Sequence, residues 1–538
     1  MNDIGRSFVR PLNPVLAVLI CAGAWVHAAD AAPRVLQVGS FHGIAGQYHT
    51  IQSAVSAAKP GDWILIGPGD YHEQGYKGEI ELAGVLIRTP GIHLRGMDRN
   101  AVIVDGTEPG AGACSAAAVE QDPGPNGSGR NGIEIFKVDG VSVENLTVCN
   151  FLADASGLNG GNQVWWNGGD GTGKIGMGSY HGAYLTATST FYDPSPTANL
   201  AQYGIFSSNS RGPGVIEHSY ASNMSDSAFY VGACPDCNAV LNYVHAQNSA
   251  QGFSGSNAGG HLVLENSEWD HNQAGIVPSA LASFDLPSVQ NGACPSDPDA
   301  SCTLIQFNFV HDNNNPNTPA AGLAATVPVG TGIDLTGGRN NTVQFNIVTN
   351  NGSWGILLND FSDYTPPPNP PGYCQGGAQN FTPPPDINTL YVPLPIPCYF
   401  HSFGNRVAGN VMWGNGSFGN ATNGDLANAA VPFRLDNCFS GNVDLKLGSP
   451  TTSPANLQNP SVAGVCGRPW NTDTSASSDE FLLTAELGCA SLGPASGACT
   501  GLPRPLYPLR TQVKLFPNPH DEGMENPCGG VPPNSWCP

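Results

Sequence analysis

Apolar and polar residues alternate along this chain in short runs that return at a nearly constant interval. Segments of the form Gly-apolar-x-apolar, or with Ala in the first place, begin at Gly204, Ala228, Gly252, Gly275, Gly332 and Gly355, mostly 23 or 24 residues apart. Alternation with a period of two over so few residues is typical of a strand with one buried face. A repeat of this length predicts stacked units that share one continuous core.

Asparagine marks the turns of the repeat. A second apolar stretch in each unit ends in Asn or His, at His218, Asn242, Asn266, Asn308, Asn346 and Asn410. Asparagine tolerates a left-handed backbone and its amide can bond the equivalent Asn one unit away, so we expect a structural role for these residues. Three short strands joined by such turns in about 23 residues describe one rung of a parallel β-helix, with rungs stacked about 4.8 Å apart. The predicted fold is an all-β, right-handed parallel β-helix.

The N-terminal part of the chain predicts one short helix followed by further strands. Residues 50–58 place Ile51, Ala54 and Val55 on one helical face, with Thr50 as the N-cap and Pro60 beyond the end. Strands are expected at 63–66, 85–88, 92–95 and 101–104. We expect the helix to cap the first rung, because an open end of a stacked sheet invites edge association.

Composition narrows the choice of partners and of fold. The 20 Lys and Arg residues against 42 Asp and Glu give a net charge of −22, which makes nucleic acid an unfavourable partner. Charged residues make up only 12% of the chain, beside 68 Gly and 46 Pro, which argues against helical bundles and coiled coils. A hydrophobic content of 40% supplies a large core and argues against disorder.

Export is expected from the first residues and from the cysteines. Arg6 and Arg10 precede an apolar run over residues 15–26, which predicts a secretory signal peptide at 1–29, with an uncleaved anchor as the alternative. Of 15 Cys, Cys21 lies in this segment and leaves 14, an even number that predicts disulfides between neighbours along the chain. We therefore expect a secreted or periplasmic monomer, with no membrane contact after cleavage.

The division of the chain follows from these patterns. After the signal peptide at 1–29, the β-helix with its N-terminal cap is expected at 30–447. Residues 448–538 lose the repeat and are rich in Pro, Gly and Cys, which predicts an irregular, disulfide-rich C-terminal cap or accessory region.

Two segments and the Asn-rich rungs resemble the pectin lyase-like superfamily of right-handed parallel β-helices. The segments are TIQSAVSAAKPGDWILIGPGDYHE (50–73) and GIHLRGMDRNAVIVDG (91–106), and with the rungs the resemblance covers roughly 400 residues. It implies the fold, but polysaccharide lyases, hydrolases, esterases, epimerases, adhesins and periplasmic accessory proteins all share that fold. GDYHE (69–73) looks like the GxYxE segment of pectin methylesterases, but their paired Asp segments do not follow, so no catalytic residue is carried over.

An outward-facing column of the repeat supplies the first candidate site. If no rung intervenes, Asp334 and Arg434 lie two rungs apart, which is about 9 to 10 Å and the span of a sugar unit. We expect Asp334, Arg434 and Asp436 to be catalytic, with Arg434 removing or stabilising a proton beside the two carboxylates. Calcium that neutralises a uronate is a possible cofactor, with Asp360 and Asp363 as ligands. The alternative is a surface ion pair.

A second column predicts a platform for sugar rings. Aromatic and imidazole rings recur at rung spacing, and the substrate-binding candidates are Tyr230, His245, Trp269, His311 and Trp413. Asp270 and Asp312, one residue further on in their rungs, are candidate general acids or bases. The alternative is that these side chains pack over turns.

The sequence thus predicts a secreted β-helix that binds an extracellular polysaccharide and, as an enzyme, cleaves it by calcium-assisted β-elimination in the manner of a uronate lyase. Two alternatives stay open: a non-catalytic cell-surface adhesion or glycan-binding scaffold, and a carbohydrate esterase or hydrolase on the same fold.

Overall fold

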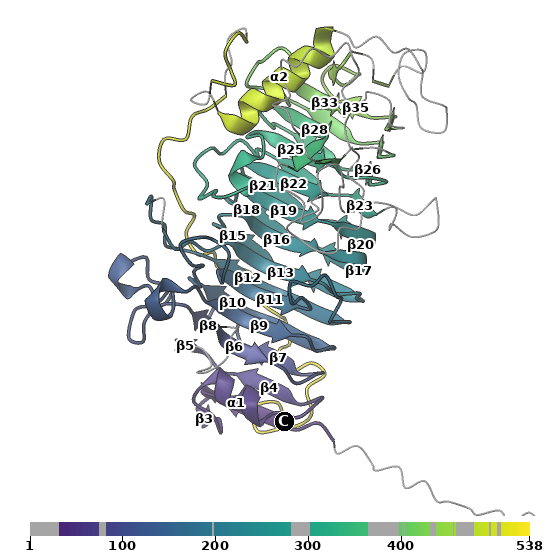
Figure 1. The fold of residues 1–538 in the computed structure, drawn as a ribbon. Coiled ribbons are helices and arrows are strands. Elements are labelled where there is room, and N and C mark those ends of the chain that lie inside the picture. Colours follow the sequence, from purple (N-terminus) through teal and green to yellow (C-terminus); the bar gives the residue numbers. More distant parts are fainter. Residues whose placement is uncertain are drawn as a thin grey trace, which may run out of the picture. The chain divides into compact units, whose positions relative to one another are not determined.

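Two parallel sheets run through the molecule (Figure 1). The computed structural model describes residues 32–538 except 75–81, 196–197, 281–301, 364–397, 401, 403, 431–436, 456, 459–477, 494–496 and 503–506. The large sheet has 21 strands, namely β1 (Val35–Val38), β4 (Trp63–Ile66), β5 (Gly69–Tyr71), β7 (His93–Gly96), β8 (Val102–Asp105), β10 (Val141–Cys149), β12 (Tyr180–Thr188), β14 (Gly214–Glu217), β15 (Tyr220–Ser222), β17 (Cys234–Asn242), β18 (His245–Gln247), β20 (Ala258–Glu265), β21 (Glu268–Asp270), β23 (Thr303–Gln306), β24 (Phe309–His311), β26 (Thr342–Gln344), β27 (Ile347–Thr349), β31 (Arg406–Ala408), β32 (Val411–Trp413), β34 (Cys438–Ser440) and β35 (Val443–Asp444). The small sheet has 11 strands, namely β6 (Ala83–Ile87), β9 (Asn131–Phe136), β11 (Asn162–Asn167), β13 (Tyr203–Ser208), β16 (Ser227–Gly232), β19 (Gln251–Ser256), β22 (Ala274–Ser279), β25 (Thr331–Thr336), β28 (Trp354–Asn359), β33 (Gly424–Ala429) and β36 (Thr452–Ser453).

The order of these strands is that of a right-handed parallel β-helix, the fold of the pectin lyase-like proteins, so the predicted fold is confirmed. In the small sheet each strand pairs in parallel with the strand of the next rung, from β6 through to β36. The repeat read from the sequence falls on β13, β16, β19, β22, β25 and β28. The strands predicted at 63–66, 85–88, 92–95 and 101–104 correspond to β4, β6, β7 and β8.

Each rung buries its inward residues against those of the rungs beside it. On the small sheet the inward ladder runs through Ile205, Phe229, Phe253, Ile276, Ile333 and Ile356, which pair in register and are fully buried. Removing such side chains from water is the main favourable term in folding, and stacking makes the core continuous.

Asparagine ladders hold the turns, as expected. Asn308 donates through Nδ2 to Oδ1 of Asn346 at 3.0 Å, and Asn346 donates in the same way to Asn410 at 2.9 Å. Asn410 continues the ladder to Asn442 at 2.8 Å. All four side chains are buried, so these amides satisfy one another and do no surface chemistry.

The predicted helix is present as α1 (Ile51–Ala57), with the Thr50 side chain accepting a hydrogen bond from the backbone N–H of Ser53. Its buried residues face β1, β4 and β6. Glu73 accepts a hydrogen bond from the Ile51 N–H at 2.5 Å, so the glutamate of the GDYHE segment supports the start of the helix. Its role as a cap of the stack stays a prediction.

Disulfides connect neighbours along the chain, as predicted. The pairs are Cys114–Cys149, Cys234–Cys237, Cys489–Cys499 and Cys528–Cys537, and Cys302 and Cys438 are also disulfide-bonded. This indicates an oxidising compartment. Within the described ranges no helix is both long and apolar enough to cross a membrane. The predicted signal peptide lies outside the described residues.

The C-terminal residues 507–538 run back along the β-helix to its first rungs, as the yellow trace in Figure 1 shows. Helix α2 (Ser478–Leu492) contacts β33 and β36 before this tail begins. Along the tail, the Lys514 carbonyl accepts from Asn248 and the N–H of Phe516 donates to Asn223. Trp536 then packs against Leu65 and Met97. The tail therefore ties the late part of the chain to the early rungs.

The remaining elements are the antiparallel pairs β2 (Ser40–Phe41) with β3 (Ile44–Ala45) and β29 (Phe361–Asp363) with β30 (Cys398–Phe400), and the 3-10 helices η1 (Ala118–Glu120), η2 (Pro125–Gly127) and η3 (Ala324–Thr326).

Candidate active site

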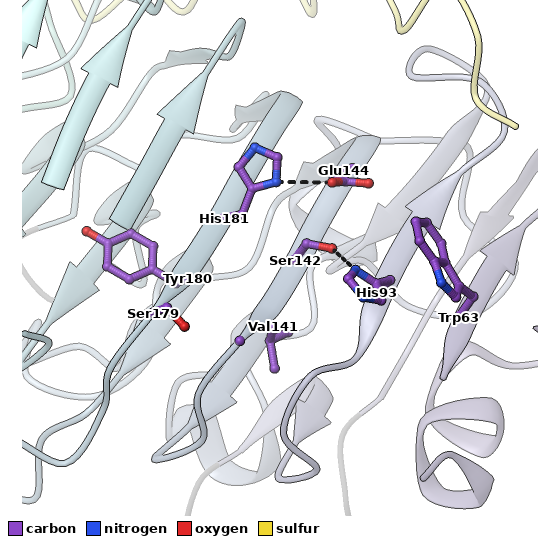
Figure 2. A pocket seen from close by; sticks show the side chains of 9 residues that line it. Trp63, His93, Val141, Ser142, Glu144, Ser179, Tyr180 and His181 are labelled. Atoms are coloured by element: carbon purple, nitrogen blue, oxygen red, sulfur yellow. Dashed lines mark hydrogen bonds and ion pairs between the residues drawn. The ribbon is translucent and has the colours of Figure 1, made fainter. Parts of the chain in front are cut away.

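A pocket of about 290 Å³ lies over strands β4, β7, β10 and β12 of the large sheet (Figure 2). Its lining is Trp63, His93, Gly140, Val141, Ser142, Glu144, Ser179, Tyr180 and His181. Histidine, serine and glutamate side chains thus share one concave surface, and a concave site with a few convergent polar groups is the usual form of a binding site.

The register of the sheet brings three of these residues into one row. Ser142 pairs with His93 on one side and with His181 on the other. Leu94 and Val143, their neighbours along the strands, belong to the buried core. Because strand side chains alternate, His93, Ser142 and His181 all point outward from the coil.

The surroundings of His93 favour its neutral form. Its Nδ1 lies 3.0 Å from Oγ of Ser142, and Trp63 stacks on its ring with the centroids 4.3 Å apart. Burial lowers the pKa of His93 below its ordinary value of 6.5, because the charged form loses solvation. A neutral imidazole at this position can accept a proton.

Two carboxylates favour the charged form of His181. Its Nδ1 lies 3.1 Å from Oε1 of Glu144 and its Nε2 lies 3.1 Å from Oε1 of Glu217, so both ring nitrogens donate when the ring is protonated (Figure 2 shows the Glu144 contact). The hydrogen bond to Glu144, supported by the one to Glu217, raises the pKa of His181 above 6.5. The imidazolium is 36% exposed and can give up a proton to a ligand.

Glu144 stays ionised although it is buried. Burial alone would raise its pKa, but hydrogen bonds from His181 and from Arg95, whose Nε lies 2.5 Å from Oε2, outweigh burial and lower it. Arg95 in turn donates through Nη1 to the carbonyl oxygens of Pro527 and Gly529. The C-terminal tail therefore helps to fix the charged groups of the pocket.

A row of half-buried and exposed rings begins beside the pocket. We name it the aromatic ridge, and it consists of Tyr184, His218, Tyr243, Phe307 and Phe345. Each of these residues occupies the bend between the two large-sheet strands of its rung, and Asn266 fills this bend in the rung between those of Tyr243 and Phe307, which leaves a gap in the ridge. Tyr184 lies on β12 three residues after His181, and His218 follows Glu217. Tyr243, Phe307 and Phe345 are 55%, 53% and 51% exposed.

The ridge is held in an unfavourable backbone conformation. Its φ angles lie between 48° and 56°, a left-handed region that bulky residues avoid and that Asn145 and Asn266 occupy at the equivalent bends of other rungs. Neighbouring rings stack, with centroids 5.2 Å apart for His218 and Tyr243. Flat rings repeated along an exposed row form a platform on which sugar rings can stack. The strain suggests a functional reason for aromatic residues here.

Two of the residues predicted to bind substrate are buried, so that prediction is corrected for them. Trp269 is fully buried, pairs with Ala246 and Val310, and donates through Nε1 to Asn308 at 3.2 Å. Trp269 belongs to the inward row, because the register of its strand differs by one residue from the register that the sequence pattern predicts. Tyr230 is 2% exposed, with its ring against Phe206 at 4.5 Å. Neither ring can stack on a sugar in this arrangement.

The other three predicted platform residues are half-buried and lie in two different rows. His245 pairs with Glu268, whereas His311 pairs with Asp270. Trp413 lies in the row of His311, two rungs later, because Thr349 pairs with both residues. His245 and His311 hydrogen-bond to carboxylates, and Trp413 is half-buried. They do not form one continuous platform.

Asp334 lies on β25 and is 1% exposed. Neither of its carboxylate oxygens has a hydrogen-bond partner of ordinary geometry. Burial raises the pKa of Asp334 to about 7, and the nearby Thr336 hydroxyl opposes this only in part. Leu357 pairs with Asp334, and the next residue in the row is Ala427, so the place expected for Arg434 is taken by Ala427. The assumed stacking was wrong because β33 forms the next rung.

Arg434 and Asp436 lie outside the described residues, so their catalytic roles stay predictions. Calcium binds six to eight oxygen ligands, and the apolar Leu357 beside Asp334 supplies none. Asp360 accepts a hydrogen bond from the Ser402 N–H at 2.7 Å, and the side chain of Asp363 lies outside the described part. Calcium therefore stays a prediction.

The pocket residues were not found from the sequence. His93 lies in a strand that was predicted at 92–95, but its partners follow long insertions. A search for histidines and carboxylates at outward positions of the early rungs would have singled out His93, Glu144 and His181.

Comparison with known proteins adds fold neighbours only. No family model matches the chain, and no curated protein matches it. The A-module of mannuronan C-5 epimerase AlgE4 from Azotobacter vinelandii is 13% identical with a TM-score of 0.42, covering 75% of this chain and 94% of that one. An alginate lyase from a Paenibacillus species is 10% identical with a TM-score of 0.33, covering 77% and 97%. At such values the likeness says nothing about the activity of this chain.

Proposed function

We propose that this protein is an exported polysaccharide lyase whose acid–base pair is His93 and His181. The observation that carries the proposal is the contrast in the surroundings of these two histidines on either side of Ser142 in one pocket, since burial lowers the pKa of His93 and two carboxylates raise the pKa of His181. Pairs of titratable groups whose surroundings drive their pKa values apart are typical of general acid–base catalysis.

The reaction that suits this pair is β-elimination from a uronate. His93, with Nδ1–H donating to Ser142, removes through Nε2 the proton on the carbon next to the carboxyl group. The electron pair left on that carbon forms a double bond as the glycosidic bond breaks. His181 gives its Nε2 proton to the departing oxygen, after this nitrogen leaves Glu217, the more exposed of its two carboxylate partners.

Elimination is favoured over glycoside hydrolysis by the state of the carboxylates. Hydrolysis requires two carboxyl groups, one as acid and one as base or nucleophile. In the pocket both Glu144 and Glu217 are bound to His181, and Glu144 is also bound to Arg95. The lowered pKa of Glu144 does not suit it to act as a carboxylic acid.

The substrate proposed is an extracellular uronate polymer that lies along the aromatic ridge and reaches the pocket at Tyr184. The chain carries a net charge of −22, so a polyanion needs local positive charge. His181 supplies one such charge, and we retain calcium as a proposed aid that neutralises the remaining uronate carboxylates.

The experiment that tests this function is incubation of the folded protein with a panel of uronate polysaccharides, with added calcium or with a chelator, while the absorbance of the unsaturated product is followed. A rise on at least one polymer supports the proposal. A flat trace with retained binding to one of these polymers would replace it with the glycan-binding scaffold.

A carbohydrate esterase is the second candidate, because Oγ of Ser142 lies 3.0 Å from Nδ1 of His93. In an esterase the Ser142 hydroxyl would donate to the neutral imidazole of His93, which would activate the hydroxyl as a nucleophile. This reverses the direction of the hydrogen bond that the lyase mechanism uses. Ser142 is only 4% exposed, which ranks this reading second. Release of acetate from an acetylated polysaccharide that Ser142→Ala abolishes would favour it.

A further inference from the structure

Three successive rungs bring histidines and carboxylates together on strands β18, β21 and β24, away from the pocket. His245 pairs in register with Glu268, and Gln247 pairs with Asp270. Asp270 then pairs with His311 of the following rung. These residues are 23 to 43 positions apart along the chain, and the stacking of the rungs makes them neighbours.

The donor atoms of this cluster are close enough to share one ion. One ligand atom each from His245, Glu268 and Asp270 lies within 4.8 Å of the others. His245 Nε2 is 2.6 Å from Oδ1 of Asp270, and His311 Nε2 is 3.0 Å from Oε1 of Glu268. These three residues offer one imidazole nitrogen and two carboxylates, and His311 adds a second imidazole beside Glu268, a combination that suits divalent transition metals.

A second layer of hydrogen bonds orients these donors. Nδ1 of His311 lies 2.8 Å from Oδ2 of Asp312, so that Nε2 is the nitrogen left to face the cluster. Gln247 donates to Oδ2 of Asp270 at 2.8 Å, and His271 contacts the same oxygen. Metal-binding histidines commonly have such a carboxylate partner on the other ring nitrogen.

The cluster is buried at Asp270 and open to solvent at Glu268. Asp270 is 4% exposed and His311 13%, whereas Glu268 is 45% exposed. An ion can therefore reach the site from solvent at Glu268 and meet buried donors below it.

We propose that His245, Glu268 and Asp270 bind one divalent transition metal ion of the zinc class, with His311 as a further ligand beside Glu268. The imidazole nitrogens favour such an ion over calcium, which prefers oxygen ligands. The site lies on other strands than the pocket, so the inference goes beyond the proposed lyase function and does not depend on it.

The test is a titration of the untagged protein with ZnCl₂ by isothermal calorimetry, after dialysis against a chelator. We expect one Zn²⁺ per chain, and no comparable heat with CaCl₂. Glu268→Gln removes an exposed ligand, and we expect it to abolish this binding. Asp312→Asn removes only the partner of His311, and we expect about a 10- to 100-fold weaker affinity.

A matched control is available on the same sheet. Nδ1 of His261 lies 2.8 Å from Oδ1 of Asp236 in an exposed pair outside the cluster, so His261→Ala is expected to bind Zn²⁺ like the original protein. Circular dichroism of each variant establishes that it is folded. The original protein taking up no Zn²⁺, or folded Glu268→Gln binding it with unchanged affinity, would overturn the proposal.

Discussion

His93 and His181 occupy the same outward row on either side of one serine, yet burial lowers the pKa of the first and carboxylates raise the pKa of the second. The contrast arises from their neighbours. Trp63 covers the ring of His93, whereas Glu144 and Glu217 take both nitrogens of His181.

This contrast predicts a bell-shaped dependence of kcat/KM on pH. Activity should rise as pH passes the pKa of His93, which lies below 6.5, because the base must be neutral. Activity should fall as pH passes the pKa of His181, which lies above 6.5, because the acid must be charged. The measurement is kcat/KM on a uronate polymer across this range. A profile that keeps rising through the alkaline side would contradict the role of His181.

Replacing a ring of the aromatic ridge is expected to lower glycan affinity without lowering the stability of the fold. Tyr243→Asn places at the left-handed bend a residue that tolerates this backbone conformation, which should add about 1 kcal/mol to the free energy of unfolding. This gain offsets the loss of the ring stacking between Tyr243 and His218. We expect the free energy of unfolding in urea to be unchanged or higher. Glycan affinity should fall by up to about tenfold, since an aromatic contact contributes roughly 0.5–1.5 kcal/mol.

The reverse substitution serves as the control. Asn266→Tyr puts a ring into the gap of the ridge, at a position with a φ of 51°. We expect lower stability, because Asn266 also loses its hydrogen bond to Asn242. If Tyr243→Asn and Asn266→Tyr both leave glycan affinity unchanged, the ridge does not contact the polymer.

Asp334 predicts a pH dependence of stability. Its pKa is about 7 in the folded chain against 3.8 for an ordinary aspartate, so between these values the unfolded chain loses a proton that the folded chain keeps. Stability therefore falls as pH rises through this window, by a contribution of roughly 4 kcal/mol at most. Asp334→Asn cannot ionise and should be the more stable protein at pH 8.

The measurement is urea unfolding of the original protein and of Asp334→Asn on both sides of this window. We expect the two to converge in acid. Equal pH dependence would mean that the carboxylate is solvated or paired. Loss of lyase activity in a stabilised Asp334→Asn would instead support the catalytic role expected from the sequence.

Removing a contact of the C-terminal tail is expected to reduce protection from hydrogen exchange in the first rungs only. Trp536 is 4% exposed against Leu65 and Met97, and its Nε1 donates to the Ile44 carbonyl at 3.1 Å. Trp536→Ala should cost about 3 kcal/mol or more. Hydrogen exchange should accelerate in β1, β4 and β7 and not in β28. Leu509→Ala, at a residue 61% exposed, is the control that should change little.

The repeat of the small sheet could be predicted because its inward residues alternate within each strand and return at a fixed interval. Phe253, Ile276 and Ile333 carry this signal without help from distant contacts. The turn asparagines were also recognised, because the ladder at Asn308, Asn346 and Asn410 uses one residue type.

The bends of the large sheet explain why the sequence pattern assigns some side chains to the wrong face of the sheet. His218 and Asn266 occupy the left-handed bend itself, whereas Asn308 and Asn346 belong to the buried ladder one residue later, and the sequence pattern merges the two positions. A shift of one residue turns an outward side chain inward, which is why Trp269 was placed on the surface. The pocket was missed because the pairing of Ser142 with His93 spans 49 residues and is fixed only by three-dimensional stacking.

The most direct test of the central claim is the initial rate of unsaturated product formation by the original protein, His93→Gln and His181→Gln on the same uronate polymer, with His261→Gln as the control. The account predicts that both pocket variants lose at least about a hundredfold in kcat while His261→Gln keeps full activity, since general acid–base groups contribute roughly 10²- to 10⁴-fold. Folded His93→Gln and His181→Gln proteins that release product as fast as the original would contradict it.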